Sequence, residues 1–288
     1  MLSYTSKYDM LDLSFINDGN LCHWISSISF MTGIILFRPT GVKPRSEITK
    51  CISDLSRGNV YVKKILMSYG HRVFNGMMHD PTEHLLITLN DLIPFHERWC
   101  TASILRYVDK EGRRMTSEQN RQPFVFANVA IHGSSILESL NRHFNASEGI
   151  ELSQKYDPPM TIEKIKTTHL SFTTNIPTFL PFTIKRWDNK GHQILTQIEE
   201  QETFDFIVYC KDGMSYTLTF SLISIIYKCH KNANNGHYTC LLRIGDNRFL
   251  HVNDSVQHIY SNYEEWQTRG LDKSFMYGYV YVYGIKHK

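Results

Sequence analysis

The most restrictive feature of this sequence is a change of pattern about a third of the way along the chain. Before it, apolar residues recur at helical spacing in residues 22–35, 46–55, 60–67 and 80–92, with an expected loop at 70–76. From Gln122 onward, β-branched and aromatic residues dominate, and they predict strands at 124–129, 179–187, 204–209, 216–227, 237–244, 249–252 and 276–283. A short helix is expected at 135–144. Helices followed by strands, without regular β-α alternation, predict an α+β fold.

Composition limits the classes of partner. The chain has 288 residues, of which 42% are hydrophobic and 20% charged, so it can bury a globular core. Its net charge of +3 is too small for a nucleic-acid-binding surface, and nucleic acid is not an expected partner. No run of about 18 apolar residues and no apolar leader occur, so neither membrane spanning nor secretion is expected.

The cysteines indicate a compartment and exclude one kind of site. The six cysteines are scattered, and no C-x-x-C pair occurs among them. A zinc ribbon is therefore not expected, and neither is any other metal or cofactor. Scattered, unpaired thiols are typical of a reducing compartment, which is the cytoplasm or the nucleus.

A candidate nucleophile lies in the stretch N-D-G-N-L-C-H-W-I-S-S-I-S-F-M, residues 17–31. Its polar start followed by apolar residues at helical spacing predicts a loop and then an amphipathic helix, with Asn20 as N-cap and Cys22 in the first turn. The unpaired amides of a first helical turn favour a thiolate, so Cys22 is expected to ionise more readily than a free thiol. The alternative is a buried, inert cysteine.

A candidate base and its orienting partner lie in residues 234–255. Two strands flank Gly245-Asp246-Asn247, which is a strong signal for a tight turn. A hairpin centred near Asp246 pairs residues whose numbers sum to about 492, and it sets Asn253 diagonal to His237 on the same face. An Asn oxygen that accepts from one ring nitrogen leaves the other nitrogen free to take a proton from a thiol. Both residues could instead be ordinary strand-end and turn residues.

These residues and several other segments resemble the catalytic domain of the ubiquitin-specific proteases, a papain-like family of deubiquitinating cysteine peptidases. The cysteine motif N-x-G-N-x-C and the histidine motif G-H-Y followed by N-D-S are both matched. A third match covers residues 80–92. Two further segments are similar to family motifs: I-P-T-F-L-P-F-T-I-K-R-W at 176–187 and the final G-Y-V-Y-V-Y. The matches occur in family order from about residue 9 to 284. The matching residues of the two catalytic motifs are Asn17, Gly19, Asn20, Cys22, Gly236, His237, Tyr238, Asn253, Asp254 and Ser255.

The resemblance implies a single papain-like domain, with a helical thumb at about 1–120 and a β palm with reduced fingers at about 121–288. It implies Cys22 as the nucleophile, His237 as the base and Asn253 as the residue that orients it. Asn17 falls where the family places a donor to the oxyanion, and Asp254 assists there. The substrate-contacting positions are Asp80, Glu83, Gly236 and Tyr238, of which the two carboxylates suit a basic tail.

Asp80 and Glu83 have a second interpretation from local sequence. Asp80, Pro81 and Glu83 also fit an N-cap, a first helical residue and a capping box. One of these carboxylates could cap the helix and also line the channel that receives the basic tail of the modifier.

The sequence departs from the family pattern at positions that bear on which modifier the protein binds. Ile25 and Ser29 replace an Asn and a Gln, and Tyr156-Asp157-Pro158-Pro159 stands where many members carry zinc-binding cysteines. Short, metal-free fingers are therefore expected. The expected partner is ubiquitin or a ubiquitin-like modifier such as SUMO, bound by a monomer.

Two rival functions remain from the sequence alone. One is a metallohydrolase built on His71, His79, Asp80, Glu83 and His84, but H-x-x-x-E-H does not fit the inverted zincin spacing and Pro81 divides the cluster. The other is a catalytically dead module that still binds ubiquitin. Retention of Cys22, His237 and Asn253 favours an active enzyme.

Overall fold

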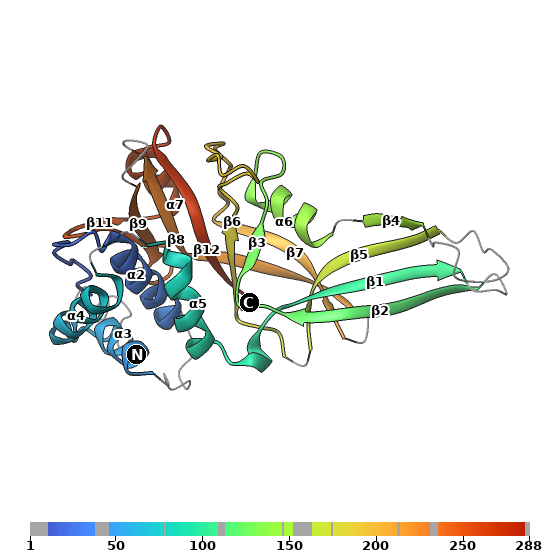
Figure 1. Cartoon of the computed structure of the whole chain (residues 1–288), viewed down its shortest axis with the longest axis horizontal. Helices are drawn as coiled ribbons and strands as arrows, with labels where there is room; N and C mark the ends of the chain where they lie inside the picture. Colours follow the sequence, from blue (N-terminus) through green and yellow to red (C-terminus); the bar gives the residue numbers. More distant parts are fainter. Residues whose placement is uncertain are drawn as a thin grey trace.

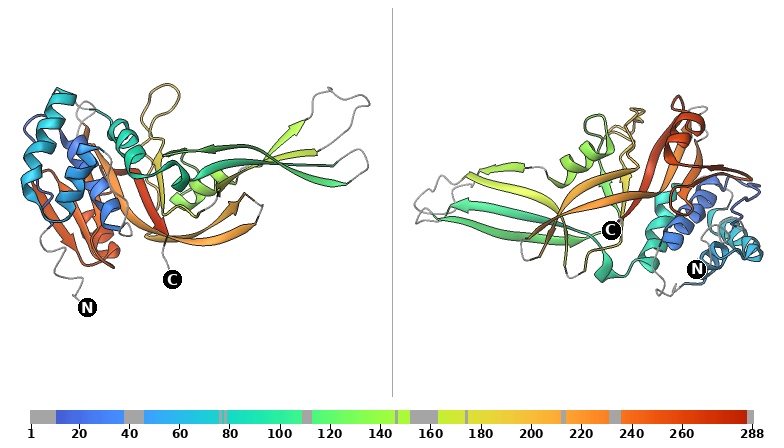
Figure 2. Two further views of the ribbon diagram at one scale, coloured as in Figure 1. Left: turned by 90° about the horizontal axis from the view of Figure 1, so that it is seen from below. Right: turned by 180° about the vertical axis from the view of Figure 1, so that it is seen from behind.

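The structure, a computed structural model, joins a group of helices to one large sheet (Figure 1). It describes residues 11–37, 46–75, 77, 79–108, 113–145, 147–151, 163–173, 175–211, 214–230 and 236–285. Figure 2 shows the helices of residues 22–92 packed at one end of the molecule, while strands β1, β2, β4 and β5 project from the other end. This mixed architecture confirms the predicted α+β class.

The helical part holds most of the helices. It contains α2 (Cys22–Phe37), α3 (Glu47–Ser56), η1 (Val60–Val62), α4 (Lys63–Phe74), α5 (Pro81–Leu92) and η2 (Phe95–Glu97). Three further elements lie among the strands: α6 (Ile136–Phe144), α7 (Tyr263–Glu265) and η3 (Trp266–Gly270). None of the helices in the described ranges is long and apolar enough to cross a bilayer.

The strands form one highly branched sheet. The main path runs in the order β11-β10-β9-β8-β7-β5-β1-β2, β12 joins β6 to β8, β3 runs parallel to β6, and β4 pairs with β5. Their bounds are β1 Cys100–Val108, β2 Arg114–Pro123, β3 Ala127–Val129, β4 Ser147–Glu151, β5 Glu163–Phe172, β6 Phe179–Ile184, β7 Thr203–Cys210, β8 Ser215–His230, β9 Gly236–Arg243, β10 Phe249–Asn253, β11 Val256–Tyr260 and β12 Met276–Ile285.

Helix α2 is the centre of the helical part. It contacts α3 and α5 on one side and β8, β9 and β10 on the other, and all its residues from Cys22 to Ile34 are buried. The prediction of an amphipathic helix was therefore wrong, because neighbours cover every face. The buried hydroxyls of Ser27, Ser29 and Thr32 remain satisfied, since each donates to the carbonyl four residues earlier at 2.8 to 3.0 Å.

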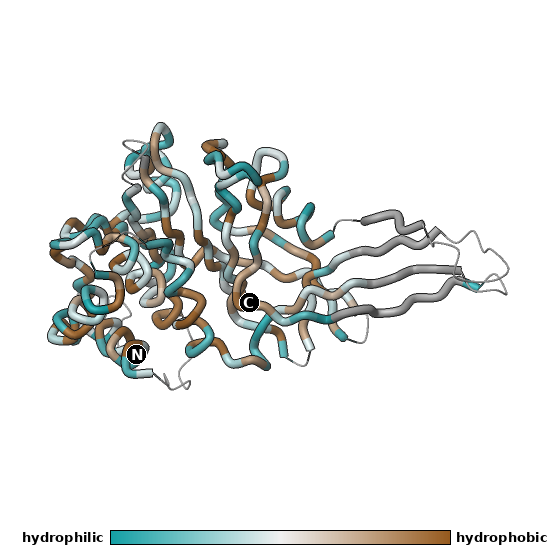
Figure 3. Tube along the Cα trace, in the orientation of Figure 1, coloured by the Kyte–Doolittle hydropathy of each residue, from teal (hydrophilic) through white to brown (hydrophobic). Residues whose placement is uncertain are grey.

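Two hydrophobic clusters hold the parts together. One surrounds α2 and the adjoining faces of β8, β9 and β12, and the other lies between α6, β6, β7 and the opposite faces of β8 and β12. Figure 3 shows the hydrophobic segments running through the helices and the central strands. The start of α2 and the β9–β10 hairpin are thereby fixed against each other.

Some predicted boundaries differ from the structure. The helical part ends at Glu97, and Cys100–Val108 and Arg114–Pro123 are strands, so it is shorter than the predicted 1–120. The predicted loop at 70–76 is wrong as far as Phe74, because α4 continues through Gly70. There the Trp24 ring packs so close to the Gly70 Cα that a side chain would collide with it. The segment Tyr156–Pro159 lies outside the described residues.

Candidate active site

Cys22 is the first residue of α2, and its side chain is only 2% exposed. The sequence predicted Asn20 as N-cap, but the first helical hydrogen bond runs from the Ile25 amide to the Leu21 carbonyl, at 2.9 Å. Asn20 lies one residue earlier with a left-handed φ of 59°. The Leu21 amide is satisfied by the Asn17 side-chain oxygen at 2.8 Å, so Asn17 shapes the turn that presents Cys22.

The Cys22 thiol is held in its neutral form. Burial raises its pKa above the ordinary value of 9.0, and the charge of Asp254 raises it further, while the backbone N–H groups of Tyr238 and His23 act in the opposite direction. The expectation that the helix start lowers this pKa was wrong, because burial outweighs the helix amides. A thiol in this state needs a base before it can act as a nucleophile.

His237 and Asn253 meet across the β9–β10 hairpin. The pairs run from Phe249 with Arg243 to Val252 with Cys240, so the predicted register sum of 492 is confirmed. Just beyond the last pair, His237 Nε2 lies 2.7 Å from Asn253 Oδ1. The amide oxygen can only accept, so Nε2 carries the proton and Nδ1 is left as the acceptor.

The helix start and the hairpin come together at Tyr238, whose backbone N–H hydrogen-bonds the Cys22 sulfur. Tyr238 directly follows His237 in the chain, and its side chain is buried. Gly236 is the first residue of β9 and pairs with His230 on β8. The segment before Gly236, residues 231–235, lies outside the described ranges.

Asn17 and Asp254 form a second contact beside the cysteine. Asn17 Nδ2 donates to Asp254 Oδ2 at 3.1 Å, and the Asp254 carbonyl accepts from the Phe15 amide at 3.0 Å. Asp254 has a left-handed φ of 52°, which turns the chain sharply after β10. An amide NH₂ has two hydrogens, so Asn17 can keep this bond and still donate to a second oxygen.

Asp80 and Glu83 lie at the start of α5, but they have different surroundings. Asp80 caps the helix, because its Oδ1 accepts from the Thr82 amide at 2.8 Å, and its Oδ2 accepts from the Tyr279 hydroxyl at 2.6 Å. The predicted capping box is wrong, because Glu83 Oε2 instead lies 3.4 Å from His79 Nδ1. The Glu83 side chain is 63% exposed. Asp80 is therefore largely engaged, while Glu83 is available to a ligand.

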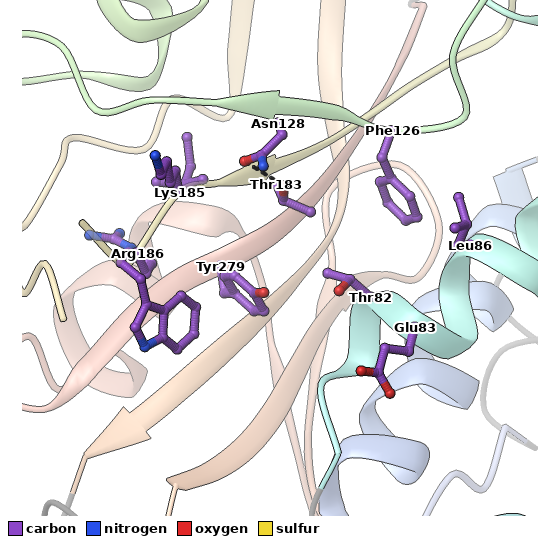
Figure 4. A pocket seen from close by; sticks show the side chains of 11 residues that line it. Thr82, Glu83, Leu86, Phe126, Asn128, Thr183, Lys185, Arg186 and Tyr279 are labelled. Atoms are coloured by element: carbon purple, nitrogen blue, oxygen red, sulfur yellow. Dashed lines mark hydrogen bonds between the residues drawn. The ribbon is translucent and has the colours of Figure 1, made fainter. Parts of the chain in front are cut away.

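A cavity of about 340 Å³ separates α5 from the sheet (Figure 4). Figure 4 shows Glu83 and Leu86 on the α5 side and Tyr279 on the β12 strand facing it. The cavity is lined by Thr82, Glu83, Leu86, Phe126, Asn128, Thr183, Ile184, Lys185, Arg186, Trp187 and Tyr279. Its volume falls within the range of ligand-binding pockets, about 300 to 1,000 Å³.

Sequence reasoning did not assign a role to Trp187, Tyr279 or Lys228. Trp187 and Tyr279 line the cavity with ring centroids 5.6 Å apart, and Lys228 Nζ lies 4.2 Å from the Trp187 ring centroid. The K-R-W and G-Y-V-Y-V-Y segments carried a signal for the two aromatic residues. Nothing in the sequence indicated Lys228, which reaches this place only through the pairing of β8 with β9 and β12.

The residues of the metallohydrolase alternative do not form one metal site. His71 Nε2 pairs with Asp18 at 2.8 Å, while Asp80 accepts from the Tyr279 hydroxyl. Among the residues that the structure describes, no three His, Cys, Asp or Glu side chains are placed to hold one metal ion.

Three histidines instead form an aromatic cluster that includes His23, the residue after Cys22. The rings of His23, His79 and His84 lie 5.2 to 6.1 Å apart by centroid, and Phe74 packs against all three. Burial, with a contribution from His79, lowers the pKa of His23 to about 4. Burial, with the charges of His23 and His79, lowers the pKa of His84 to about 3. These two rings are neutral at pH 7 and serve as packing groups.

Comparison with known proteins gives one family and one fold. The sequence model of the family described as ubiquitin carboxyl-terminal hydrolase matches residues 15–283. Comparison with curated proteins gives no match.

Several solved structures share the fold at low identity. The SAGA Ubp8/Sgf11/Sus1/Sgf73 DUB module bound to ubiquitin aldehyde is 16% identical with a TM-score of 0.67, covering 100% of this chain and 72% of that one. A Ubp8 variant of the module bound to monoubiquitin is 17% identical with a TM-score of 0.66, covering 98% and 70%. The yeast module with an Sgf73 variant is 16% identical with a TM-score of 0.64, also covering 98% and 70%.

Proposed function

The chain belongs to the family of ubiquitin carboxyl-terminal hydrolases and is a cysteine peptidase of that family, and we propose that Cys22, His237 and Asn253 carry its chemistry. The proposed reaction is hydrolysis of the bond that follows the C-terminal glycine of ubiquitin. The observation that carries the assignment is the 2.7 Å contact between His237 and Asn253, beside a helix start that presents Cys22 to the backbone of Tyr238.

In the first proposed step, His237 Nδ1 removes the proton of the Cys22 thiol. This base is needed because burial keeps the thiol neutral. The sulfur attacks the carbonyl carbon of the terminal glycine, an S–C bond forms, and the carbonyl electron pair moves to the oxygen. Asn253 holds the imidazole in the tautomer that has Nδ1 free, and it favours the imidazolium formed in this step.

In the second proposed step, the tetrahedral intermediate collapses and its C–N bond breaks. The leaving lysine amine takes the proton from His237, and ubiquitin remains attached to Cys22 as a thioester. His237 then removes a proton from water, which attacks the thioester and releases the ubiquitin carboxylate, and the Cys22 thiol regains its proton.

Asn17 is proposed as the donor that stabilises the oxyanion. Its Nδ2 keeps one hydrogen on Asp254 and has another for the developing negative charge. Because Asp254 fixes the amide before the reaction, little reorganisation is needed when the charge appears. Asp254 is therefore proposed to act through Asn17 rather than on the substrate.

The cavity between α5 and the sheet is proposed to hold the C-terminal tail of ubiquitin. Glu83 lines this cavity and is exposed, so it can pair with an arginine of the tail. Ubiquitin is favoured over SUMO because similar structures include modules bound to monoubiquitin and to ubiquitin aldehyde. A reactive thiol must stay reduced, so we further propose a cytoplasmic or nuclear site of action.

The proposal is tested by measuring cleavage of ubiquitin and of SUMO, each joined through its C-terminal glycine to the lysine of a reporter peptide. Faster cleavage of the ubiquitin conjugate is expected. Faster cleavage of the SUMO conjugate would replace ubiquitin by SUMO as the modifier. Ubiquitin binding without cleavage of either conjugate would identify a binding module and contradict the enzyme mechanism.

A further inference from the structure

Residues 12–15 form a strap between helix α4 and the turn that follows β10. Leu13 and Phe15 are buried, with exposed fractions of 0% and 3%, and the other two residues of the strap are half-buried. This alternation is typical of an extended segment with one buried face. The strap leads into the loop before Cys22, since Asn17 follows Phe15 by two residues.

On one side, the strap is hydrogen-bonded to the turn after β10 and to β11. The Phe15 amide donates to the Asp254 carbonyl at 3.0 Å, and the Leu13 amide donates to Gln257 Oε1 at 3.2 Å. Gln257 Nε2 donates in turn to Asp12 Oδ1 at 3.0 Å. The strap is thus bound to the main chain of the residue whose side chain accepts from the proposed oxyanion donor.

On the other side, Lys63 of α4 binds the strap. Its Nζ lies 2.6 Å from Asp12 Oδ2 and donates to the Ser14 carbonyl at 2.8 Å. The same ammonium lies 5.4 Å from the centroid of the Phe15 ring, within the range of a cation–π contact. The Lys63 side chain is only 18% exposed, so these contacts are screened less than those of a surface lysine.

Local helix formation does not account for Lys63. It is the first residue of α4, where a positive charge is unfavourable because the unpaired amides already carry partial positive charge. The partner charge comes from the strap. Burial raises the pKa of Asp12, but hydrogen bonds from Lys63 and Ser14 outweigh it and lower the pKa from 3.8 to about 2. The Asp12 carboxylate is therefore charged at neutral pH.

We propose that Lys63 is a positioning residue, whose ion pair with Asp12 holds the strap and thereby fixes the Asn17 amide where the oxyanion forms. The strap reaches Asn17 along the chain and also through Asp254. A displacement of about 1 Å can cost 10²-fold in rate, so a fixed strap matters although none of its residues lines the cavity. This inference rests on the proposed function, because Asn17 is the proposed oxyanion donor.

The test compares two reactions of the Cys22 thiol. One is cleavage of a ubiquitin conjugate, in which an oxyanion forms. The other is reaction with a ubiquitin that ends in an alkyne, in which the sulfur adds to one alkyne carbon, a proton goes to the other, and no oxyanion forms. Lys63→Met should lower kcat for cleavage about ten-fold, which is less than the 10²- to 10³-fold cost of losing an oxyanion donor. KM and the rate of the alkyne reaction should stay nearly unchanged.

Matched variants separate the ion pair from the fold. Asp12→Asn breaks the same pair from the strap, and it takes the place of Lys63→Met if that variant does not fold. Because both changes remove one interaction, the double variant should cost no more than Lys63→Met alone. Lys63→Arg should keep cleavage fast, and Lys64→Met, which removes an exposed lysine of the same helix, should leave both reactions unchanged.

Two results would overturn the inference. An equal fall in both reactions would mean that Lys63 supports the fold or the thiol rather than the oxyanion donor, and unchanged cleavage would mean that the strap needs no ion pair. Either result, with an unmutated chain that cleaves the conjugate, refutes only the role of Lys63. If the unmutated chain cleaves no ubiquitin conjugate, the proposed function is refuted, and the inference with it.

Discussion

Acid should destabilise this protein because of its buried histidines. The ring of His23 is fully buried, and neither nitrogen has a hydrogen-bond partner among the described residues. The ring of His84 packs on Phe74 at a centroid distance of 3.9 Å, and its Nε2 is likewise buried without a partner. Protonating either ring would place a charge in an apolar cluster.

The size and sign of this change in the free energy of unfolding follow from the pKa values of the two histidines. The pKa of His23 is about 4 and that of His84 about 3 in the folded chain, against an ordinary value of 6.5. Folding therefore favours the neutral rings, and this stabilisation is complete above pH 6.5 and is lost as the pH falls toward 4 and 3. At pH 5, 1.5 units below 6.5, each histidine costs about 2 kcal/mol, or about 4 kcal/mol together.

The assay is urea unfolding at pH values between 8 and 5, with the free energy of unfolding plotted against pH. His84→Phe should flatten the slope by about 1.4 kcal/mol per pH unit below pH 6, since one proton fewer is taken up on unfolding. The comparison variant is His192→Gln, which removes an exposed histidine outside the cluster. Equal slopes for His84→Phe and the unmutated chain would refute the reasoning.

Three further substitutions test the site and its support. Cys22→Ala should abolish turnover of a ubiquitin conjugate and keep ubiquitin binding, so unimpaired cleavage would remove Cys22 from the mechanism. Asn253→Ala should lower kcat by about 100-fold with little change in KM; an effect on KM alone would make Asn253 a binding residue. Gly278→Ala should cost roughly 3 kcal/mol in urea unfolding, because the new methyl would overlap the Tyr281 hydroxyl and the buried Glu200 carboxylate. An unchanged urea midpoint would contradict that overlap.

Local signals predicted the parts of the site that depend on local structure. The Gly245-Asp246-Asn247 turn predicted the register of β9 and β10, and this register brings His237 to Asn253. Asp80 was predicted to cap a helix that begins with Pro81, and it does so. In these cases the deciding contacts lie within about twenty residues of each other in the chain.

Features that depend on distant contacts could not be predicted in this way. Strand β2 has the sequence R-M-T-S-E-Q-N-R-Q-P, which shows no apolar alternation, and its conformation depends on pairing with β1. The glycine at position 70 suggested a loop, whereas it makes room for Trp24. The raised pKa of Cys22 depends on burial by neighbouring elements, and the sequence showed only the helix start.

The lining of the cavity is another feature that depends on residues distant in the chain and could not be predicted from local sequence. Glu83 and Tyr279 are nearly two hundred residues apart, yet they line one groove. The motif at 80–92 indicated the first residue, but the partners on β3, β6 and β12 follow only from the order of strands in the sheet.

The most direct test of the central claim is the position of the covalent bond formed with a ubiquitin that carries a C-terminal thiol-reactive group. After proteolysis, mass spectrometry locates the modified cysteine. The mechanism predicts one adduct, on Cys22, that forms far more slowly after His237→Ala. An adduct on any other cysteine, or one on Cys22 whose rate does not depend on His237, would contradict it.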